Sequence, residues 1–342
     1  MSGNTPDIFD LSYFQANHLA MSGKLQDLKP FFEHDSEISY NDLIPSVAKA
    51  LEYRGGAYVI CPTFGINSLC TNSQIVNSEN DWSLNKLYEL IEEYGSTTVL
   101  GPEFDRHMFW EYVLTYAHNW LIDEDAAECY FDSDDFINLL KISSKFPSEF
   151  IDDSSHSEGR VYMGEQMFVS GQNVTLMDLA FKNSLFGGTE IYLPFPAGEN
   201  NGLAAYPFFR LGMSSASKNA EGVWEFLKFI LINDGFFYGI PNYQPHLSEY
   251  YKAGTNLEFP TYKLAAKYDG SVVEIESSEI NDETVNMMAK LIERIDCIYD
   301  YEAALYNIIE EETQAYYAGV RSAEETARLI QSRASIYISE KN

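Results

Sequence analysis

Acidic side chains are the residues of this sequence that could do chemistry, because many of them stand side by side. Hydrolysis of a glycosidic bond needs two carboxyl groups, one as the acid and one as the base or nucleophile. The groups that qualify are Glu92–Glu93, Asp123–Glu124–Asp125, Asp132/Asp134/Asp135, Asp152–Asp153 and Glu310–Glu311–Glu312. Since the chain has 52 acidic residues, such groups are expected by chance, and most fall on predicted helices. A carbohydrate-active hydrolase is therefore an alternative and not the leading hypothesis.

Other catalytic and cofactor-binding motifs are missing. The sequence contains no GxSxG, GxxxxGK[ST] or GxGxxG pattern, so hydrolase, NTPase and dinucleotide-binding signatures are absent. The four cysteines (61, 70, 129 and 297) form no CxxC pair, and the six histidines include no HExxH motif. We expect free buried thiols, with a Cys61–Cys70 disulfide as the alternative, and no metal site or cofactor.

The charge of the chain excludes some partners. It has 22 basic and 52 acidic residues, for a formal net charge of −30. An acidic surface repels phosphate backbones, so we expect no nucleic-acid binding. Hydrophobic residues make up 45% of the chain, which is typical of a globular protein with a core. The sequence contains neither a signal peptide nor an apolar run of about 18 residues that could span a membrane.

Predicted strands alternate with predicted helices, which indicates an α/β fold. Strand-like runs lie at 58–61, 97–100, 160–170, 190–195 and 208–213. Helical patterns begin at Ser83, Phe109 and Ser133, and three more close the chain at 282–299, 301–318 and 323–338. Ser322 and Glu325 form a predicted capping box for the last helix. The chain has no repeat or low-complexity linker, so we expect its two domains to interleave or to be joined by more than one short connection.

Eight ordered segments resemble one protein family. They are PDIFDLS (6–12), GKLQDLKPFFE (23–33), YVICPTFGINSL (58–69), DWSLNKLYELIEEY (81–94), CYFDSDDFINLLKISSKFP (129–147), LFGGTEIYLPFPAGENNG (185–202), MSSASKNAEGVWEFLKFIL (213–231) and SAEETARLIQSRASIYISE (322–340). In order and spacing they resemble extracellular solute-binding proteins of sugar-type ABC transporters, the group that includes maltose-binding protein.

The resemblance implies a two-lobed fold of the periplasmic-binding-protein type, with interleaved lobes and a helical C-terminus. Lobe 1 would comprise residues 1–63 and 210–283, and lobe 2 residues 64–209 and 284–342. Such proteins close their lobes on a solute and hand it to a membrane permease without chemistry. The leading hypothesis is therefore a monomeric importer component that binds a carbohydrate, with an oligosaccharide expected first. A hydrolase and a non-transport sensor module are the alternatives.

The sequence departs from the family pattern near its N-terminus. In the family, the counterpart of Pro6–Phe9 follows a signal peptide, a strand, a long helix and a second strand, which this sequence lacks. We expect lobe 1 to be incomplete there, with an exposed sheet edge beside residues 6–12. The intact protein would then be extracellular, as a membrane-anchored lipoprotein or in the periplasm. The alternative is that Met1 is a genuine start.

Candidate ligand-binding residues follow from the resemblance and from a rule of α/β sheets. Ligands bind beyond the carboxyl ends of strands, and sugar sites combine aromatic faces with polar groups. The candidates are Asp10, Tyr13, Phe64, Asn67, Trp110, Tyr206 and Tyr243. We expect Trp110 and Tyr206 to stack on sugar rings, whereas Trp82 and Trp224 are expected to pack in the core. For each candidate, core packing is the alternative.

Overall fold

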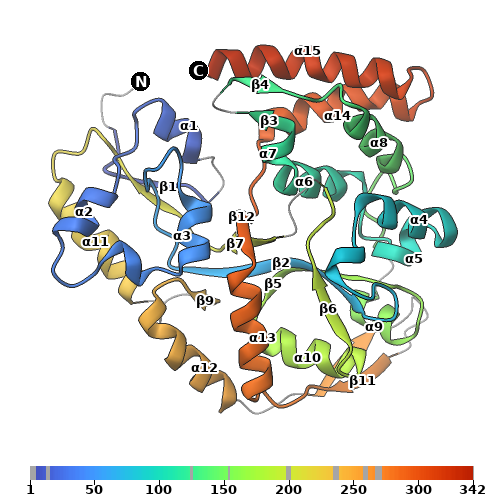
Figure 1. Cartoon of the computed structure of the whole chain (residues 1–342), viewed down its shortest axis with the longest axis horizontal. Coiled ribbons are helices and arrows are strands. Elements are labelled where there is room, and N and C mark those ends of the chain that lie inside the picture. Colours follow the sequence, from blue (N-terminus) through green and yellow to red (C-terminus); the bar gives the residue numbers. More distant parts are fainter. Residues whose placement is uncertain are drawn as a thin grey trace.

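One long strand, β2 (Thr63–Asn72), runs through the middle of the molecule and organises its central sheet (Figure 1). The structure is a computed structural model and describes residues 5–12, 16–123, 126–152, 155–197, 202–233, 239–256, 261–265 and 272–341. All residues of β2 except the last are buried. Since successive side chains of a strand point to opposite faces, both faces of the sheet must be covered by other elements.

The central sheet contains five further strands. β2 pairs antiparallel with β5 (Val169–Val174), β6 (Glu190–Leu193), β7 (Leu203–Pro207) and β9 (Ile240–Pro241), and β7 pairs parallel with β12 (Ile295–Ile298). Leu69 faces one apolar core, whereas Phe64 and Ile66 face another. β2, β12 and the segment after β7 connect the two lobes of the molecule.

Lobe 1 is built around a small antiparallel sheet on the left of Figure 1. The sheet consists of β1 (Ile8–Asp10) and β8 (Leu211–Met213), and within the described residues β1 pairs only with β8. The surrounding helices are α1 (Ala16–Met21), α2 (Lys29–His34), α3 (Pro45–Leu51) and α11 (Ala220–Ile232). Phe32, Trp224 and Leu227 are central to its core.

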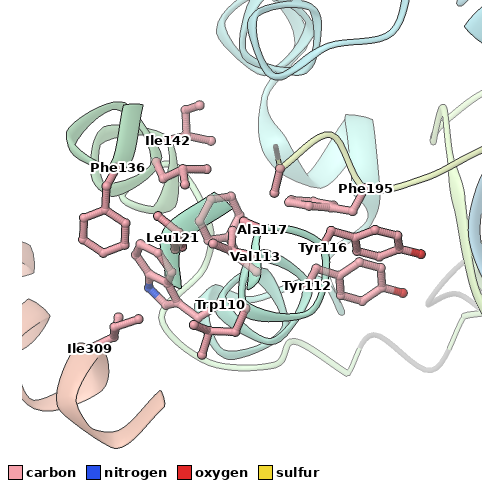
Figure 2. Close-up of a cluster of buried hydrophobic side chains, with 14 of the residues drawn as sticks. Trp110, Tyr112, Val113, Tyr116, Ala117, Leu121, Phe136, Ile142, Phe195 and Ile309 are labelled. Atoms are coloured by element: carbon pink, nitrogen blue, oxygen red, sulfur yellow. The ribbon is translucent and has the colours of Figure 1, made fainter. Parts of the chain in front are cut away.

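Lobe 2 is mainly helical and lies on the right of Figure 1. Its helices are α4 (Leu84–Tyr94), α5 (Ser96–Leu100), α6 (Arg106–Tyr116), α7 (His118–Leu121), α8 (Asp134–Ser143), α9 (Ser157–Tyr162), α14 (Ala303–Tyr317) and α15 (Ala323–Lys341). A hairpin of β3 (Ile122–Asp123) and β4 (Glu128–Cys129) lies at its edge. Figure 2 shows part of its core, in which Trp110 lies near Phe136 and Ile309.

A third apolar cluster lies on the lower side of the central sheet, as Figure 1 is drawn. It is covered by α10 (Leu176–Phe186), α12 (Leu247–Thr255), α13 (Asp282–Glu293) and the hairpin β10 (Thr261–Ala265)–β11 (Val272–Glu276). Ile44 and Val47 near α3 join residues of α10, α13 and the sheet in this cluster. We call it the lower core. It joins segments from both predicted lobes, whose exact boundaries stay a prediction.

Predicted helix starts agree with the structure where a capping residue marked them. Ser83 accepts a hydrogen bond from the amide of Lys86, and Ser133 accepts one from Phe136. The capping box of α15 is confirmed, because the Glu325 amide donates to Ser322 Oγ and the Ser322 amide donates to Glu325. Caps satisfy amides that have no partner inside the helix, so their sequence signal is local and readable.

Several predicted element types and boundaries were wrong. Residues 97–100 form helix α5 between two glycines, and a short apolar run cannot distinguish helix from strand. The predicted helix 282–299 ends at Glu293, because Ile295–Ile298 pair with β7 as strand β12. The strand expected at 58–61 lies instead beyond Pro62, as β2. The front of 160–170 is helical, and the run 208–213 is a strand only from Leu211.

The four cysteines are free, as expected. Cys61, Cys70 and Cys129 are buried, and Cys297 is half-buried beside the inter-lobe region. Burial raises the pKa of the Cys61 and Cys70 thiols to about 12, so both stay protonated at neutral pH.

Candidate functional site

A polar cavity of about 370 Å³ lies between the two lobes. Lobe 1 contributes α1 and the end of α3, including Asn17 and Lys49, and lobe 2 contributes Thr115, Tyr116 and His118. Its floor is formed by segments that connect the lobes, with Arg210, Cys297 and Asp300. We call this cavity the inter-lobe pocket. Its size falls within the range of ordinary small-molecule sites.

An ion pair links the two connecting segments at the floor of the pocket. Arg210 Nη1 lies 2.7 Å from Asp300 Oδ2, and the Arg210 side chain is almost fully buried. Burial raises the pKa of the Asp300 carboxyl, and the guanidinium of Arg210 offsets this only in part. Because its charge is balanced by Asp300, Arg210 does not make the pocket selective for anions.

A cluster of tyrosines surrounds a carboxylate one helical turn from the pocket. Glu111 lies on the same face of α6 as Thr115, and its Oε1 is 3.1 Å from His107 Nε2. The Tyr299 hydroxyl donates to Glu111 Oε2 at 3.3 Å. Burial, together with a hydrogen bond to Glu111, raises the pKa of Tyr301. We call these four residues (His107, Glu111, Tyr299 and Tyr301) the tyrosine–carboxylate cluster.

The cluster adjoins the floor of the pocket at Asp300, although its own residues do not line the cavity. Tyr299 and Tyr301 flank Asp300, and Thr115 Oγ1 donates to the Asp300 carbonyl oxygen at 3.4 Å. The ring of Tyr206 lies 5.6 Å from that of Tyr299, so an aromatic surface from β7 adjoins the cluster. A carboxylate acceptor next to half-buried aromatic rings can accept hydrogen bonds from hydroxyl groups while the rings contact an apolar face of the same ligand.

Three of the candidates predicted from the sequence are buried. Phe64 is 0% exposed and belongs to the lower core. Asn67 donates from Nδ2 to the Tyr112 hydroxyl at 3.2 Å and accepts from the Tyr116 hydroxyl at 2.7 Å, which uses its amide within the protein. Trp110 is 2% exposed. Their burial leaves no face for a ligand in this conformation.

Figure 2 explains why Trp110 is covered. Its indole points toward Phe136 and Ile309, away from the side on which Tyr112 and Tyr116 present their hydroxyls. Its Nε1 donates to the Tyr317 hydroxyl at 3.0 Å. The sequence placed an aromatic helix near the cleft, but the helical face that carries Trp110 is the core face. Trp82 and Trp224 also pack in the core, as expected, at 6% and 4% exposure.

The remaining candidates differ in their surroundings. Asp10 is exposed and accepts from the amide and hydroxyl of Ser12. Tyr206 is half-buried and its ring contacts Phe208 as well as Tyr299. Tyr243 packs against the lobe 1 core, with its ring 4.9 Å from His246. Tyr13 lies outside the described residues.

Sequence reasoning missed Glu111, Arg210 and Asp300. The run Tyr299-Asp300-Tyr301, between a strand and a helix, carried a usable signal, because aromatic and acidic residues alternate there. Glu111 carried the weaker signal of a histidine four residues before it. Arg210 had no local signal, since its role depends on Asp300, far away in the sequence.

Two other kinds of feature, a metal site and a membrane-spanning helix, are not found among the described residues. Among them, no group of three His, Cys, Asp or Glu side chains is arranged to hold a metal ion. A search of the same residues finds no helix with the length and apolarity needed to cross a membrane.

The fold matches solved structures, although no family model matches the sequence and no curated protein is significantly similar to it. A solute-binding protein from Thermotoga lettingae, bound to α-D-tagatose, is 14% identical with a TM-score of 0.55 over 98% of this chain and 86% of its own. A putative oligosaccharide-binding protein from Synechococcus is 16% identical with a TM-score of 0.57 over 99% and 86%.

A third match is the sugar-binding protein MalE from Xanthomonas citri, at 12% identity and a TM-score of 0.57 over 98% of this chain and 84% of its own. The chain has the fold of ABC-transporter solute-binding proteins. The predicted two-lobed α/β fold is thereby confirmed. At these identities the likeness concerns the fold, and the ligand must be argued from the site.

Proposed function

We propose that this protein is the solute-binding component of an ABC importer and binds a carbohydrate in the inter-lobe pocket. The observation that carries the proposal is a polar cavity lined by residues of both lobes. The tyrosine–carboxylate cluster adjoins its floor at Asp300. A ligand there would contact both lobes at once, so its binding would favour the closed arrangement. Closure is how a two-lobed protein presents its cargo to a permease.

The chemistry of the pocket suits a neutral polyhydroxyl ligand. Arg210 is balanced by Asp300, and the other charged residues of the lining, Lys49, Glu52 and Asp296, carry both signs. Tyr206 and Tyr299 supply aromatic surface. The structural neighbours include proteins bound to tagatose, acarbose, cycloalternan, maltotriose and β-1,6-galactobiose, which supports a carbohydrate here.

We propose that the protein performs no catalysis. Several of the acidic groups that favoured a hydrolase are used elsewhere: Glu311 and Glu312 pair with Arg333, and Glu92 pairs with Lys145. Asp134 and Asp135 occupy the first turn of α8, where negative charge stabilises a helix. An extracellular or periplasmic location, a membrane anchor, a monomeric state and a permease partner belong to the same proposal.

The test is direct titration with a panel of mono- and oligosaccharides, followed by calorimetry and by an assay for new reducing ends. We expect stoichiometric, reversible binding of at least one sugar without product. The variant Glu111→Gln should weaken that binding about tenfold or more, because it replaces a charged hydrogen-bond acceptor by a neutral one. Glu283→Gln, at an exposed position of α13, is the matched control and should bind as the parent does.

Two results would contradict the proposal. The first is sustained product formation from any glycan at catalytic protein concentration. The second is an equal affinity of the parent and Glu111→Gln for the bound sugar, which would place the ligand outside the tyrosine–carboxylate cluster.

A further inference from the structure

α3 borders two cavities. The end of this helix lines the inter-lobe pocket, whereas its start, with Pro45 and Ser46, lines a second cavity of about 670 Å³. The other walls of the second cavity come from α12, α13 and the first residue of β12. Figure 1 shows α3 above α12 and α13, and we call the cavity between these helices the lower groove.

The walls of the lower groove are mostly apolar and are held in place. They comprise Ile44, Pro45, Leu247, Ala289, Ile292 and Ile295. Three of these, Ile44, Ile292 and Ile295, are buried members of the lower core. Ser46 Oγ donates to the carbonyl oxygen of Ile292 at 2.7 Å, which fastens the start of α3 to the end of α13. A preformed apolar cavity of this size is typical of a small-molecule site.

A few polar groups complete the lining. Lys49 and Glu293 are exposed, and neither side chain has an ion-pair partner within the part of the chain that the structure describes. Tyr251 is half-buried, and among the same residues its hydroxyl has no hydrogen-bond partner. Burial raises the pKa of Tyr251, so its hydroxyl remains a donor at neutral pH. These groups are therefore available to a ligand.

The two charges of the lower groove stand on different walls. Lys49 belongs to α3, whereas Glu293 is the last residue of α13, and they form no ion pair with each other. The carboxyl end of a helix carries a partial negative charge, which adds to the attraction of Glu293 for a cation. The complementary ligand has an apolar body with a positive charge at one end and a negative charge at the other.

We propose that the lower groove is a second ligand site, which binds a zwitterionic dipeptide with apolar side chains. The ammonium group of the dipeptide lies beside Glu293 and its carboxylate beside Lys49, while its side chains contact Leu247 and Ile292. The Tyr251 hydroxyl donates to the peptide carbonyl oxygen. A single amino acid carries both charges on one carbon and cannot serve both walls, and a sugar has neither the charges nor the apolar body.

The test of the charges uses leucyl-phenylalanine, its N-acetyl form and its C-terminal amide, titrated calorimetrically into the full chain. We expect each modified peptide to bind about twofold to fivefold more weakly, because an exposed ion pair contributes little. In Glu293→Gln the acetyl group should make no difference, and in Lys49→Gln the amide should make none. Glu283→Gln and Lys290→Gln, at exposed positions of α13 outside the lining, are the matched controls and should keep both differences.

The test of the location is a variant that fills the lower groove. Ala289→Phe places a ring in the cavity and should weaken the binding of leucyl-phenylalanine at least tenfold. Glu283→Phe adds the same ring at an exposed position of the same helix and should bind as the parent does. Thermal unfolding shows whether Ala289→Phe is folded, and if it is not, the charge variants decide.

The second site does not depend on the proposed carbohydrate function. If no sugar binds, that function fails, and the peptide titrations still decide on the lower groove. A sugar that fills the inter-lobe pocket should leave the peptide bound. Three results overturn the proposal: no binding of leucyl-phenylalanine at millimolar concentration, an unchanged affinity in folded Ala289→Phe, or an effect of acetylation that persists in Glu293→Gln. Displacement of the peptide by a sugar also overturns it, because the peptide would then occupy the inter-lobe pocket.

Discussion

On the two sides of the central sheet, the lobes are joined by different kinds of interaction. On the upper side, lobe 1 meets lobe 2 through the polar contact of His18 with Glu302, and the ion pair of Arg210 with Asp300 links the connecting segments below it. On the lower side, α3 meets α10 and α13 through the apolar side chains of the lower core. Water can replace a polar contact at little net cost, whereas separating buried apolar surface costs about 25 cal/mol per Å². The upper side is therefore the side suited to opening, and the lower side is suited to act as the pivot.

The strongest test of this comparison is a cavity in the lower core. Phe64 is fully buried there, so Phe64→Ala should lower the free energy of unfolding by about 3–5 kcal/mol. Urea unfolding followed by circular dichroism measures the loss. Phe226→Ala, at a phenylalanine of α11 that is 46% exposed, is the control and should change stability by less than about 1 kcal/mol. Equal losses in the two variants would remove the distinction between the lower core and the surface.

An ion pair inside lobe 1 sharpens the comparison, because it should respond to pH without moving the lobes. Burial alone would raise the pKa of the Asp35 carboxyl. Hydrogen bonds from Lys228, Trp224 and two backbone amides outweigh this effect and lower the pKa to about 2. A carboxyl with a depressed pKa stabilises the fold above its unfolded pKa of 3.8, and this stabilisation is lost as the pH falls through about 2.

Asp35→Asn should therefore lower the free energy of unfolding by about 2 kcal/mol at pH 7, with a difference that shrinks between pH 4 and pH 2. Denaturant titrations at several pH values measure this. A pH-independent difference would show that the charge of Asp35 is not its cause.

The smallest expected effect is on sugar affinity, and it distinguishes residues beside the pocket from residues of the lobe 2 core. Tyr206 is half-buried against Tyr299, so Tyr206→Ala should weaken sugar binding several-fold, about 1 kcal/mol, and leave the fold intact. Trp110→Ala should instead lower stability, because its ring is in the lobe 2 core. Calorimetric titration and thermal unfolding of both variants measure this contrast. A loss of affinity without loss of stability in Trp110→Ala would return that residue to the ligand site.

The sequence predicted local features well and long-range ones poorly. The helix caps at Ser133 and Ser322 follow from residues three positions away along the chain, and the α/β class follows from the alternation of strand-like and helical runs. The extent of β2 could not be predicted, because Gly65, Asn67 and Ser68 are poor strand formers that become extended only when both faces are covered.

The site was harder to predict for the same reason. Trp110 and Glu111 are neighbours in sequence, yet the first faces the lobe 2 core and the second faces Tyr299. Which face of α6 meets the cleft is decided by α14 and β12, far away in the chain. Choosing a candidate by its aromatic residue type therefore picked Trp110, on the core face of α6. The face that carries Glu111 could be identified only from its neighbours in the folded structure.

The pairing of β1 with β8 also constrains how the chain reaches this structure. Ile8 lies opposite Met213, so the sheet of lobe 1 cannot form until residues on both sides of the long lobe 2 segment are present. Contacts between residues so distant in sequence form slowly, because a large loop must close before they contribute. During synthesis, the first strand must therefore wait for most of the chain. The lobe 2 core is discontinuous as well, because it includes α14 and α15, so it is complete only when the end of the chain has been synthesised.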